Sequence, residues 1–229
     1  PAEDRENKDT IASLLLFAST YANSKDCDQT LDDYLERMSD DQDKIYFCVA
    51  DTYEAAANSP HIEGLKSKGI EVLLLTDRID EWVMAGLMEY QGKELINVAK
   101  EDIVDEETKK VSEGDQEIIS KIQKHLGDKV SDVIISKRLT DSASCIVLPK
   151  HEPGAQLRKI LEASGQTLGS SNPIFEINMK HKLVKKLKDM KGKQFNSFVD
   201  FLYDYAVIAE GGSPQDPSKY LRQLDKYLS

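Results

Sequence analysis

Hydrophobic and polar positions in the first third of the chain predict a strand, a helix and a second strand in succession. Residues 45–50, IYFCVA, are rich in β-forming side chains, and residues 52–68 suit a helix that is interrupted near Ser59-Pro60. Residues 70–75, IEVLLL, form a continuous apolar run. Because two parallel strands need a crossover helix, this order predicts a βαβ unit whose second strand is buried on both faces.

Two helices are expected before this unit. The first begins at Asp9 or Thr10, with apolar residues following at helical spacing. The second begins at Thr30, where Asp33 stands three positions later, as in a capping box.

The second half of the chain predicts an α+β arrangement behind an acidic segment. Residues 101–117 contain eight acidic residues against Lys109 and Lys110, which indicates a linker or an exposed helix start. A helix ending near Leu126 follows. The further expected elements are strands over 130–139, 145–149 and 174–178, and helices over 154–164, 180–190, 195–209 and 217–228.

The last two helices carry wide apolar stripes. The stripe residues are Phe195, Phe198, Leu202, Tyr205 and Ala209 in the first helix and Tyr220, Leu221, Leu224 and Leu228 in the second. Such helices can pack on their own domain, or they can pair with a second copy as a four-helix bundle. Burying about eight large side chains at roughly 1.5–3 kcal/mol each gives a gross gain that can exceed the cost of association.

Two other stretches combine apolar and charged residues. Asp80 and Glu81 precede Trp82, the only tryptophan, with Met84 close behind. Residues 153–165 place Leu157, Ile160 and Leu161 on one side of an expected helix. Each stretch is open to two interpretations: ordinary core, or an apolar surface for another protein.

Composition narrows the function classes. The chain has 229 residues, 41 of them acidic and 30 basic, for a net charge of −11, which disfavours binding to nucleic acid or an anionic membrane. An odd number of cysteines, Cys27, Cys48 and Cys145, predicts reduced and mostly buried thiols in a cytosolic protein. The chain begins at Pro1 without Met, so we expect a piece of a longer protein.

Catalytic and cofactor motifs give little support to an enzyme. Asp51 and Asp77 follow parallel strands and therefore share the sheet edge where ligands bind in α/β folds, so a small-molecule enzyme using this edge is one alternative. The other interpretation is that both residues end strands and cap helices. No glycine-rich phosphate motif accompanies them. The four histidines lack metal-ligand spacing, and the lysines of residues 180–193 favour a solvated amphipathic helix over a nucleic-acid patch.

The stretch QDKIYFCVADTYEAAANSPHIEGLKSKGIEVLLLTDRIDEWVM, followed by SKRLTDSASCIV and IFEIN, resembles the bacterial heat-shock protein 90 chaperones, the HtpG proteins. The resemblance covers essentially the whole chain. It implies that residues 1–110 are the C-terminal part of the middle domain, and that residues 111–229 are the C-terminal dimerisation domain, ending in a helical bundle.

The resemblance also implies a function and a set of partners. This chain is expected to bind unfolded or partly folded clients and to form a homodimer in the cytoplasm, with neither nucleic acid nor membrane as a partner. ATP and Mg are expected in the N-terminal domain of the parent protein, so the chain itself is expected to have no cofactor, no metal and no catalytic residue.

Site residues follow from the resemblance by position. The client-binding residues it implies are Glu81, Trp82, Leu157, Ile160 and Leu161. Met84 is expected to join them, because it stands beside Trp82 in the same stretch. The dimer-interface residues are expected to be Phe198, Leu202, Tyr205, Tyr220, Leu221, Leu224 and Leu228. Trp82 is expected to be partly exposed toward the space between the two arms of the dimer.

Overall fold

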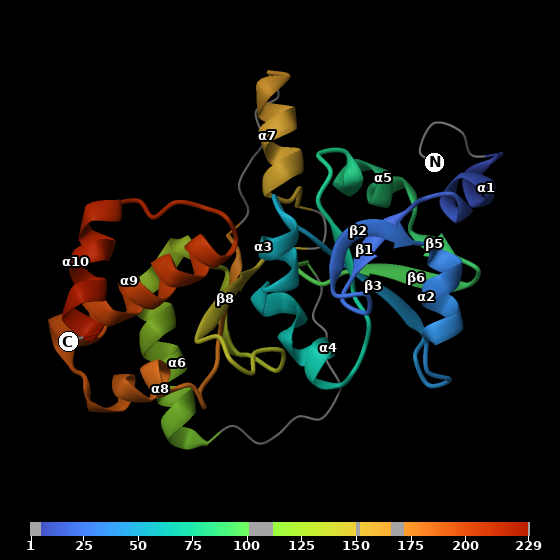
Figure 1. Cartoon of the computed structure of the whole chain (residues 1–229). Coiled ribbons are helices and arrows are strands. Elements are labelled where there is room, and N and C mark those ends of the chain that lie inside the picture. The colour runs from blue at the N-terminus through green and yellow to red at the C-terminus, as the bar shows by residue number, and fades with distance from the viewer. Residues whose placement is uncertain (1–5, 101–111, 150–151, 166–171, 229) are drawn as a thin grey trace. The chain divides into compact units, whose positions relative to one another are not determined.

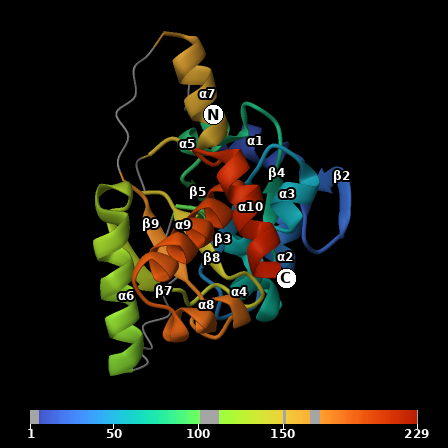
Figure 2. The ribbon, with the colours of Figure 1, turned by 90° about the vertical axis from the view of Figure 1, so that its left-hand side faces the viewer.

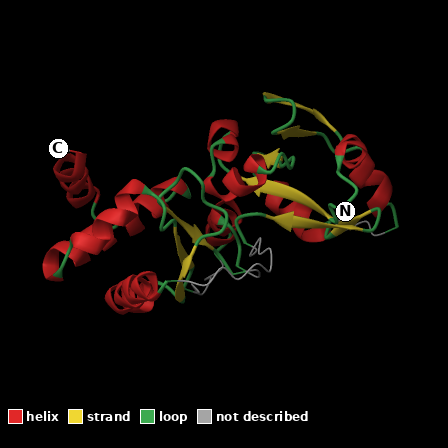
Figure 3. Ribbon diagram, turned by 90° about the horizontal axis from the view of Figure 1, so that it is seen from below, coloured by secondary structure: helices red, strands yellow, loops and turns green. Residues whose placement is uncertain are grey.

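The computed structural model describes residues 6–100, 112–149, 152–165 and 172–228 (Figure 1). The chain divides into two compact units. Unit 1 comprises Pro1–Glu101 and Pro153–Leu168, and unit 2 comprises Asp102–Glu152 and Gly169–Ser229. Helices and strands are mixed in both units (Figure 3), which agrees with the expected mixed α/β class.

Unit 1 is built on a six-stranded sheet with the order β2-β1-β4-β3-β6-β5. The strands are β1 (Phe17–Ser19), β2 (Ser24–Gln29), β3 (Lys44–Val49), β4 (Leu73–Leu75), β5 (Glu89–Tyr90) and β6 (Lys93–Asn97). The central strand β3 pairs in parallel with β4 and β6, and the remaining pairs are antiparallel.

The predicted βαβ unit is confirmed. Between β3 and β4 lie α3 (Tyr53–Ala57), a 3-10 turn η1 (Pro60–Ile62) and α4 (Glu63–Ser67), so the helix is interrupted where Ser59-Pro60 predicted. All three residues of β4 are buried. The parallel pairing of β3 with β4 places the ends of both strands on one edge of the sheet.

Helix α2 (Leu31–Arg37) forms where the sequence predicts it. Helix α1 (Lys8–Ser13) also forms, but its N-cap position is Asn7, so the expected start at Asp9 or Thr10 is corrected. At the start of α2, the Thr30 side chain accepts from the backbone N–H of Asp33, and Asp33 accepts from the backbone N–H of Thr30. The capping box is therefore complete.

Tyr34 of α2 links this helix to the sheet. Its hydroxyl donates to the carbonyl of Glu71 at 2.8 Å and accepts from the backbone N–H of Tyr46 at 3.1 Å. Burial raises the pKa of Tyr34 to about 12, because the phenolate would lose its hydration inside the unit.

Four strands of unit 1 were not predicted. Strand β2 reads SKDCDQ, is largely exposed and lies at one end of the sheet, so it has no hydrophobic periodicity to detect. Strands β1 and β5 have three and two residues, too few for a period of two to show. Strand β6, KELIN, is stabilised by its parallel pairing with β3, which is distant in sequence.

Unit 2 combines a three-stranded sheet, order β7-β9-β8, with helices (Figure 2). Its strands are β7 (Asp132–Ile135), β8 (Ser144–Val147) and β9 (Ile174–Ile177), and its helices are α6 (Glu113–Leu126), α8 (Lys182–Lys185), α9 (Gly192–Ala209) and α10 (Pro217–Leu228). The 3-10 turns η2 (Gly127–Lys129) and η3 (Lys186–Asp189) complete it. The helix expected over 180–190 is thus split into α8 and η3.

A buried ion pair lies beside the sheet of unit 2. The guanidinium of Arg138 contacts both carboxylate oxygens of Glu176 on β9, at 3.2 and 3.1 Å, and the Ser136 hydroxyl donates to the same carboxylate at 2.6 Å. Both charged side chains are almost fully buried. Removing the charge of Arg138 would leave the Glu176 carboxylate without the guanidinium that pairs with it in a low-dielectric interior.

The expected domain boundary and the expected state of the cysteines can both be compared with the structure. The boundary expected after residue 110 lies outside the described residues and stays a prediction; α7 (Ala155–Ala163) belongs to unit 1, although it is flanked by unit 2 in sequence. The three cysteines are free. Cys48 and Cys145 are buried as expected, whereas Cys27 is exposed on β2.

Candidate binding surfaces

Helix α5 (Asp80–Gly86) of unit 1 starts from a turn fixed by two carboxylates. Asp77 accepts from the backbone N–H of Ile79 at 3.2 Å, and Asp80 accepts from the backbone N–H of Asp77 at 2.7 Å. Burial raises the pKa of Asp80, and the neighbouring charge of Asp77 acts in the same direction. The turn sets the orientation of α5 at the end of β4.

Trp82 projects from α5 into solvent. Its exposed fraction is 56%, and Ile79, three positions earlier and therefore on the same side of the helix, is equally exposed. Met88, just beyond the helix, is exposed as well. The expectation of a partly exposed Trp82 is confirmed, and its position relative to a second protomer stays a prediction.

Met84 does not belong to this surface. It is buried in the core of unit 1 together with residues of the sheet. Residues two positions apart on a helix do not face the same way, so Trp82 and Met84 point to different sides of α5. The expectation that Met84 contacts a client is therefore corrected.

Glu81 is not an exposed residue either, because only 5% of its side chain is accessible. Its carboxylate accepts from Lys100 Nζ at 2.5 Å, from the backbone N–H of Gly154 at 2.6 Å and from that of Leu157 at 3.3 Å. Its contacts are thus to this chain's own residues, and the expected direct contact with clients is corrected as well.

Helix α7 lies next to α5 in unit 1 (Figures 1 and 2). Its apolar residues Leu157, Ile160 and Leu161 are each half-buried, so the helix is neither a sealed core element nor a fully free one. Half-burial therefore does not decide between a core helix and an exposed apolar surface, and the role of α7 in binding stays a prediction.

Helices α9 and α10 of unit 2 contact each other through aromatic rings. The rings of Phe198 and Tyr227 meet edge to face with centroids 4.6 Å apart, and those of Phe201 and Tyr220 stack at 5.4 Å. Gln223 Nε2 donates to the carbonyl of Ser197 at 2.7 Å. This pair of helices is therefore packed within one protomer.

The burial of these helices corrects part of the expected dimer interface. Phe198 and Leu202 are completely buried in the core of unit 2, so neither is free to contact a second copy. Because these side chains are already removed from water inside the protomer, association of two copies gains no further free energy from burying them.

An apolar edge of the pair nevertheless stays accessible. Leu221 has an exposed fraction of 58%, and Ile208 near the end of α9 is exposed too. The other expected interface residues Tyr205, Tyr220 and Leu224 are half-buried, and the side chain of Leu228 lies outside the described residues.

Asp200 connects three helices of unit 2 through one ion pair and one hydrogen bond. Asp200 of α9 contacts His125 Nε2 of α6 and Lys219 Nζ of α10, each at 2.9 Å. Burial acts to raise the pKa of Asp200, but the hydrogen bonds from Lys219 and His125 outweigh it and lower the pKa. The hydrogen bond to Asp200 raises the pKa of Lys219.

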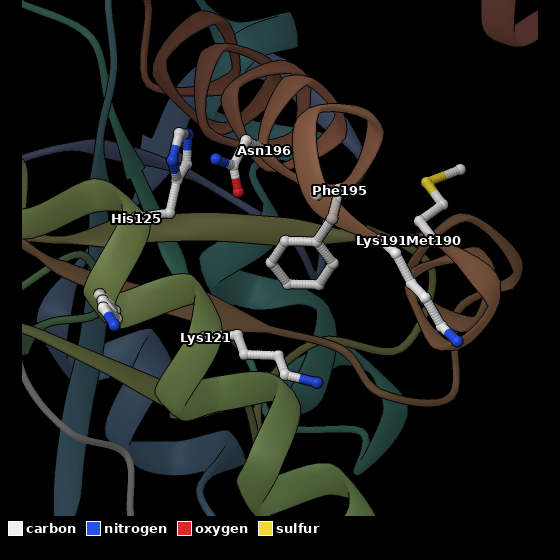
Figure 4. A pocket seen from close by; sticks show the side chains of 8 residues that line it. Lys121, His125, Met190, Lys191, Phe195 and Asn196 are labelled. Carbon is white, nitrogen blue, oxygen red and sulfur yellow. The ribbon is translucent and has the colours of Figure 1, made fainter.

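A pocket of about 430 Å³ lies between α6 and the start of α9 (Figure 4). Its lining includes Lys121, His125, Lys191, Phe195 and Asn196. Two of these side chains already have partners, because Lys121 pairs with Glu117 at 2.7 Å and His125 contacts Asp200. The pocket does not bring together an acid, a base and a nucleophile.

The edge of the sheet that carries Asp51 and Asp77 has the features of strand and helix ends. Thr52 caps α3 by accepting from the backbone N–H of Ala55 at 3.1 Å, and Asp77 serves the turn before α5. The expectation that Asp51 and Asp77 cap the following helices is therefore corrected, because Thr52 is the cap of α3 and α5 has no side-chain cap. The hydrogen bond that Asp77 accepts in the turn still favours a structural role over a small-molecule enzyme.

The comparisons with known proteins agree with one another. The family model described as Hsp90 protein matches residues 2–229. The chain is 43% identical over 235 residues to the chaperone protein HtpG of Aromatoleum aromaticum, covering 99% of this chain and 36% of that protein. It is 44% identical over 236 residues to HtpG of Chromobacterium violaceum, covering 99% and 37%. HtpG of Pseudoalteromonas translucida is 42% identical over 238 residues, covering 100% and 37%.

The chain belongs to the Hsp90 family. The resemblance inferred from the sequence is thereby confirmed, and the chain spans a little more than a third of the length of these relatives. In the part of this Hsp90 chain that the structure describes, no group of His, Cys, Asp and Glu is arranged to hold a metal ion. Among the described helices, none has the length and hydropathy to cross a membrane.

Sequence reasoning missed two residues at the α5–α7 contact of this Hsp90 chain. Lys100 and Gly154 meet Glu81 from segments 19 and 73 residues away, so neither residue gave a local signal. Gly154 was expected as the first residue of a helix over 154–164, whereas α7 begins one residue later, and the partner of Gly154 left no signal in the sequence.

Proposed function

We propose that this chain is the part of an HtpG-type chaperone that binds partly folded clients and joins two copies into a homodimer. Residues 1–110 would be the end of the middle domain and residues 111–229 the C-terminal dimerisation domain. The observation that carries the client-binding proposal is the exposure of Trp82 on α5 and of Ile79 directly before it, with α7 next to α5.

The chemistry of this surface suits many partners. An exposed indole and aliphatic side chains offer apolar area, while the acidic residues around them keep the chain soluble when no client is bound. A shaped pocket with fixed polar groups would select one ligand, whereas an open apolar strip accepts different sequences.

Client binding is tested by measuring how the chain suppresses aggregation of a thermally unfolded enzyme. Trp82→Ala is expected to weaken suppression several-fold, because it removes the largest exposed apolar side chain of α5. Leu14→Ala is the matched control, since Leu14 is also an exposed apolar residue of unit 1 but lies at the end of α1. Equal activity of wild type and Trp82→Ala would count against this surface.

The dimerisation proposal rests on the exposed edge of α10. Leu221→Glu is expected to raise the dimer dissociation constant by at least tenfold in sedimentation, because a carboxylate would be buried in the interface. Ser218→Glu adds the same charge to an exposed position in the first turn of α10 and is the control. A wild-type chain that stays monomeric at micromolar concentration would refute the proposal.

We further propose that ATP and Mg act in the N-terminal domain of the parent protein, and that this chain carries neither cofactor nor catalytic residues. The proposed location of the parent protein is the cytoplasm. Titration of the chain with ATP and Mg in a calorimeter is expected to give no binding heat. Saturable binding would move part of the nucleotide site into this chain.

A further inference from the structure

The buried carboxylate of Glu81 occupies the N-terminus of α7. In this helix Gly154 is the residue before the first helical position, and Leu157 is the third residue of the helix. Their backbone N–H groups have no partner within the helix, because the first N–H groups of any helix lack a carbonyl four positions earlier. One oxygen of Glu81 accepts from Gly154 and the other from Leu157.

These two N–H groups are the ones that a capping box satisfies from within a helix's own first turn. In α7 the acceptor of both bonds is Glu81, which precedes Gly154 by 73 positions and Leu157 by 76. The cap of α7 is therefore a tertiary contact, and the start of this helix is tied to the first turn of α5.

Gly154 is what allows the carboxylate to approach. A Cβ atom placed on this residue would lie 2.8 and 2.9 Å from the two carboxylate oxygens of Glu81, inside normal contact distance. The carboxylate has little freedom to move aside, because Lys100 Nζ also donates to it at 2.5 Å. Glycine is thus required by the contact itself.

We propose that Glu81 is a positioning residue that docks α7 onto α5, and that it influences clients through α7 without touching them. The statement about clients rests on the proposed function, whereas the docking itself does not. With α7 held, Leu157 and Ile160 stay in a fixed relation to Trp82. When the Glu81 contact is lost, α7 keeps its apolar residues but no longer has the hydrogen bonds that tie its first turn to α5.

Hydrogen–deuterium exchange of the backbone amides of residues 154–163, without any client, tests the docking. Glu81→Gln places an amide N–H₂ group among the donors of Lys100, Gly154 and Leu157, and it removes the charge. We expect exchange in α7 to become about 2- to 30-fold faster, the range that corresponds to losing a helix cap. Gly154→Ala is expected to give a similar increase while leaving every side chain of α5 unchanged.

Two control variants separate docking from general effects. Glu89→Gln removes a charge from an exposed position of unit 1. Gly114→Ala adds a methyl group near the start of α6, where a Cβ meets nothing within 4 Å. Neither control is expected to change exchange in α7. Glu81→Gln could destabilise unit 1 as a whole, which faster exchange in β3 would reveal. In that case the exchange of α7 in Gly154→Ala decides whether the contact docks this helix.

The double variant Glu81→Gln/Gly154→Ala distinguishes one shared contact from two independent local effects. If both residues act through the same contact, the double variant exchanges no faster than the more affected single variant. Additive increases, or exchange in α7 within a factor of two of wild type for both single variants, would overturn the proposal.

A second measurement addresses the effect on clients. Glu81→Gln and Gly154→Ala are expected to weaken suppression of aggregation to similar extents, and Trp82→Ala is expected to leave exchange in α7 unchanged. If wild type suppresses no aggregation, the proposed function fails while the exchange result still stands. If Glu81→Gln alone weakens suppression while Gly154→Ala loosens α7 without effect on clients, the proposed action through α7 is wrong.

Discussion

Helices α5 and α7 of unit 1 and helices α9 and α10 of unit 2 use apolar residues in opposite ways. On α5 the charged residue Glu81 is buried and the largest apolar residue, Trp82, is exposed. In α9 and α10 the aromatic residues Phe198 and Phe201 are buried, and the exposed apolar positions lie at the edge of the stripe. The first pair is linked by hydrogen bonds from a buried carboxylate to a helix end, and the second by a packed core.

This contrast shows what an apolar pattern along a helix does and does not determine. Periodicity identifies the residues that share a side of the helix. Whether that side is covered depends on a partner elsewhere in the chain, and a buried carboxylate can supply the contact as well as a leucine. The four substitutions that follow test the contrast in order of expected effect.

Phe198→Ala is expected to have the largest effect, a loss of about 3–5 kcal/mol in the free energy of unfolding of unit 2. Phe198 is fully buried between α9 and α10, so its removal leaves a cavity. Hydrogen exchange of the α9 amides measures the loss, and Ile208→Ala, at an exposed position of the same helix, is the control. An effect as small as that of the control would mean that the two helices do not form a packed core.

Met84→Ala is expected to destabilise unit 1 by about 2–5 kcal/mol, because its side chain fills the core beneath α5. Exchange of the β3 and β4 amides is the measurement. The matched control is Met88→Ala, which removes the same atoms from an exposed position. If the two methionine variants behaved alike, the assignment of Met84 to the core would be wrong.

Asp200→Asn is expected to destabilise unit 2 at neutral pH and to have little effect in acid. Because the pKa of Asp200 is lowered in the folded state, its stabilising contribution is present above the unfolded pKa of about 3.9 and disappears as the pH falls through the lower folded value. Urea unfolding at pH 7 and near pH 3 compares the variant with wild type. A difference that grew on acidification would contradict the direction of the shift.

Trp82→Ala is expected to have the smallest effect on stability, less than about 1 kcal/mol, because more than half of the side chain is already in solvent. Exchange of the α5 amides should therefore match wild type even where suppression of aggregation is reduced. A loss as large as that expected for Met84→Ala would place Trp82 in the core.

The sequence predicted the elements whose signals are local. The capping box of Thr30 and Asp33, the apolar run of β4 and the break at Ser59-Pro60 depend on residues a few positions apart. Strand β2, by contrast, reads SKDCDQ and forms because β1 pairs with it. A polar edge strand carries no hydrophobic pattern, so a single sequence does not reveal it.

In the candidate site, too, features with a local sequence signal were predicted and features that depend on distant residues were not. The exposure of Trp82 was expected correctly, whereas Met84 was assigned to the wrong side of a helix whose geometry already separated the two residues. Glu81 was identified as part of the site, but its partners Lys100 and Gly154 come from distant segments. Long-range pairing of one carboxylate with two backbone amides has no signature in the order of residues.

The assignment of α7 to unit 1 has a consequence for limited proteolysis. The polypeptide passes between the units at 101/102, at 152/153 and again at 168/169, so each unit is assembled from two separate stretches. A single cut between residues 102 and 111 would yield two peptides, neither of which contains all of unit 1. The shorter peptide would keep the sheet, and the longer would carry the helix that docks beside it, so the nicked halves should co-migrate on a sizing column for as long as that docking lasts.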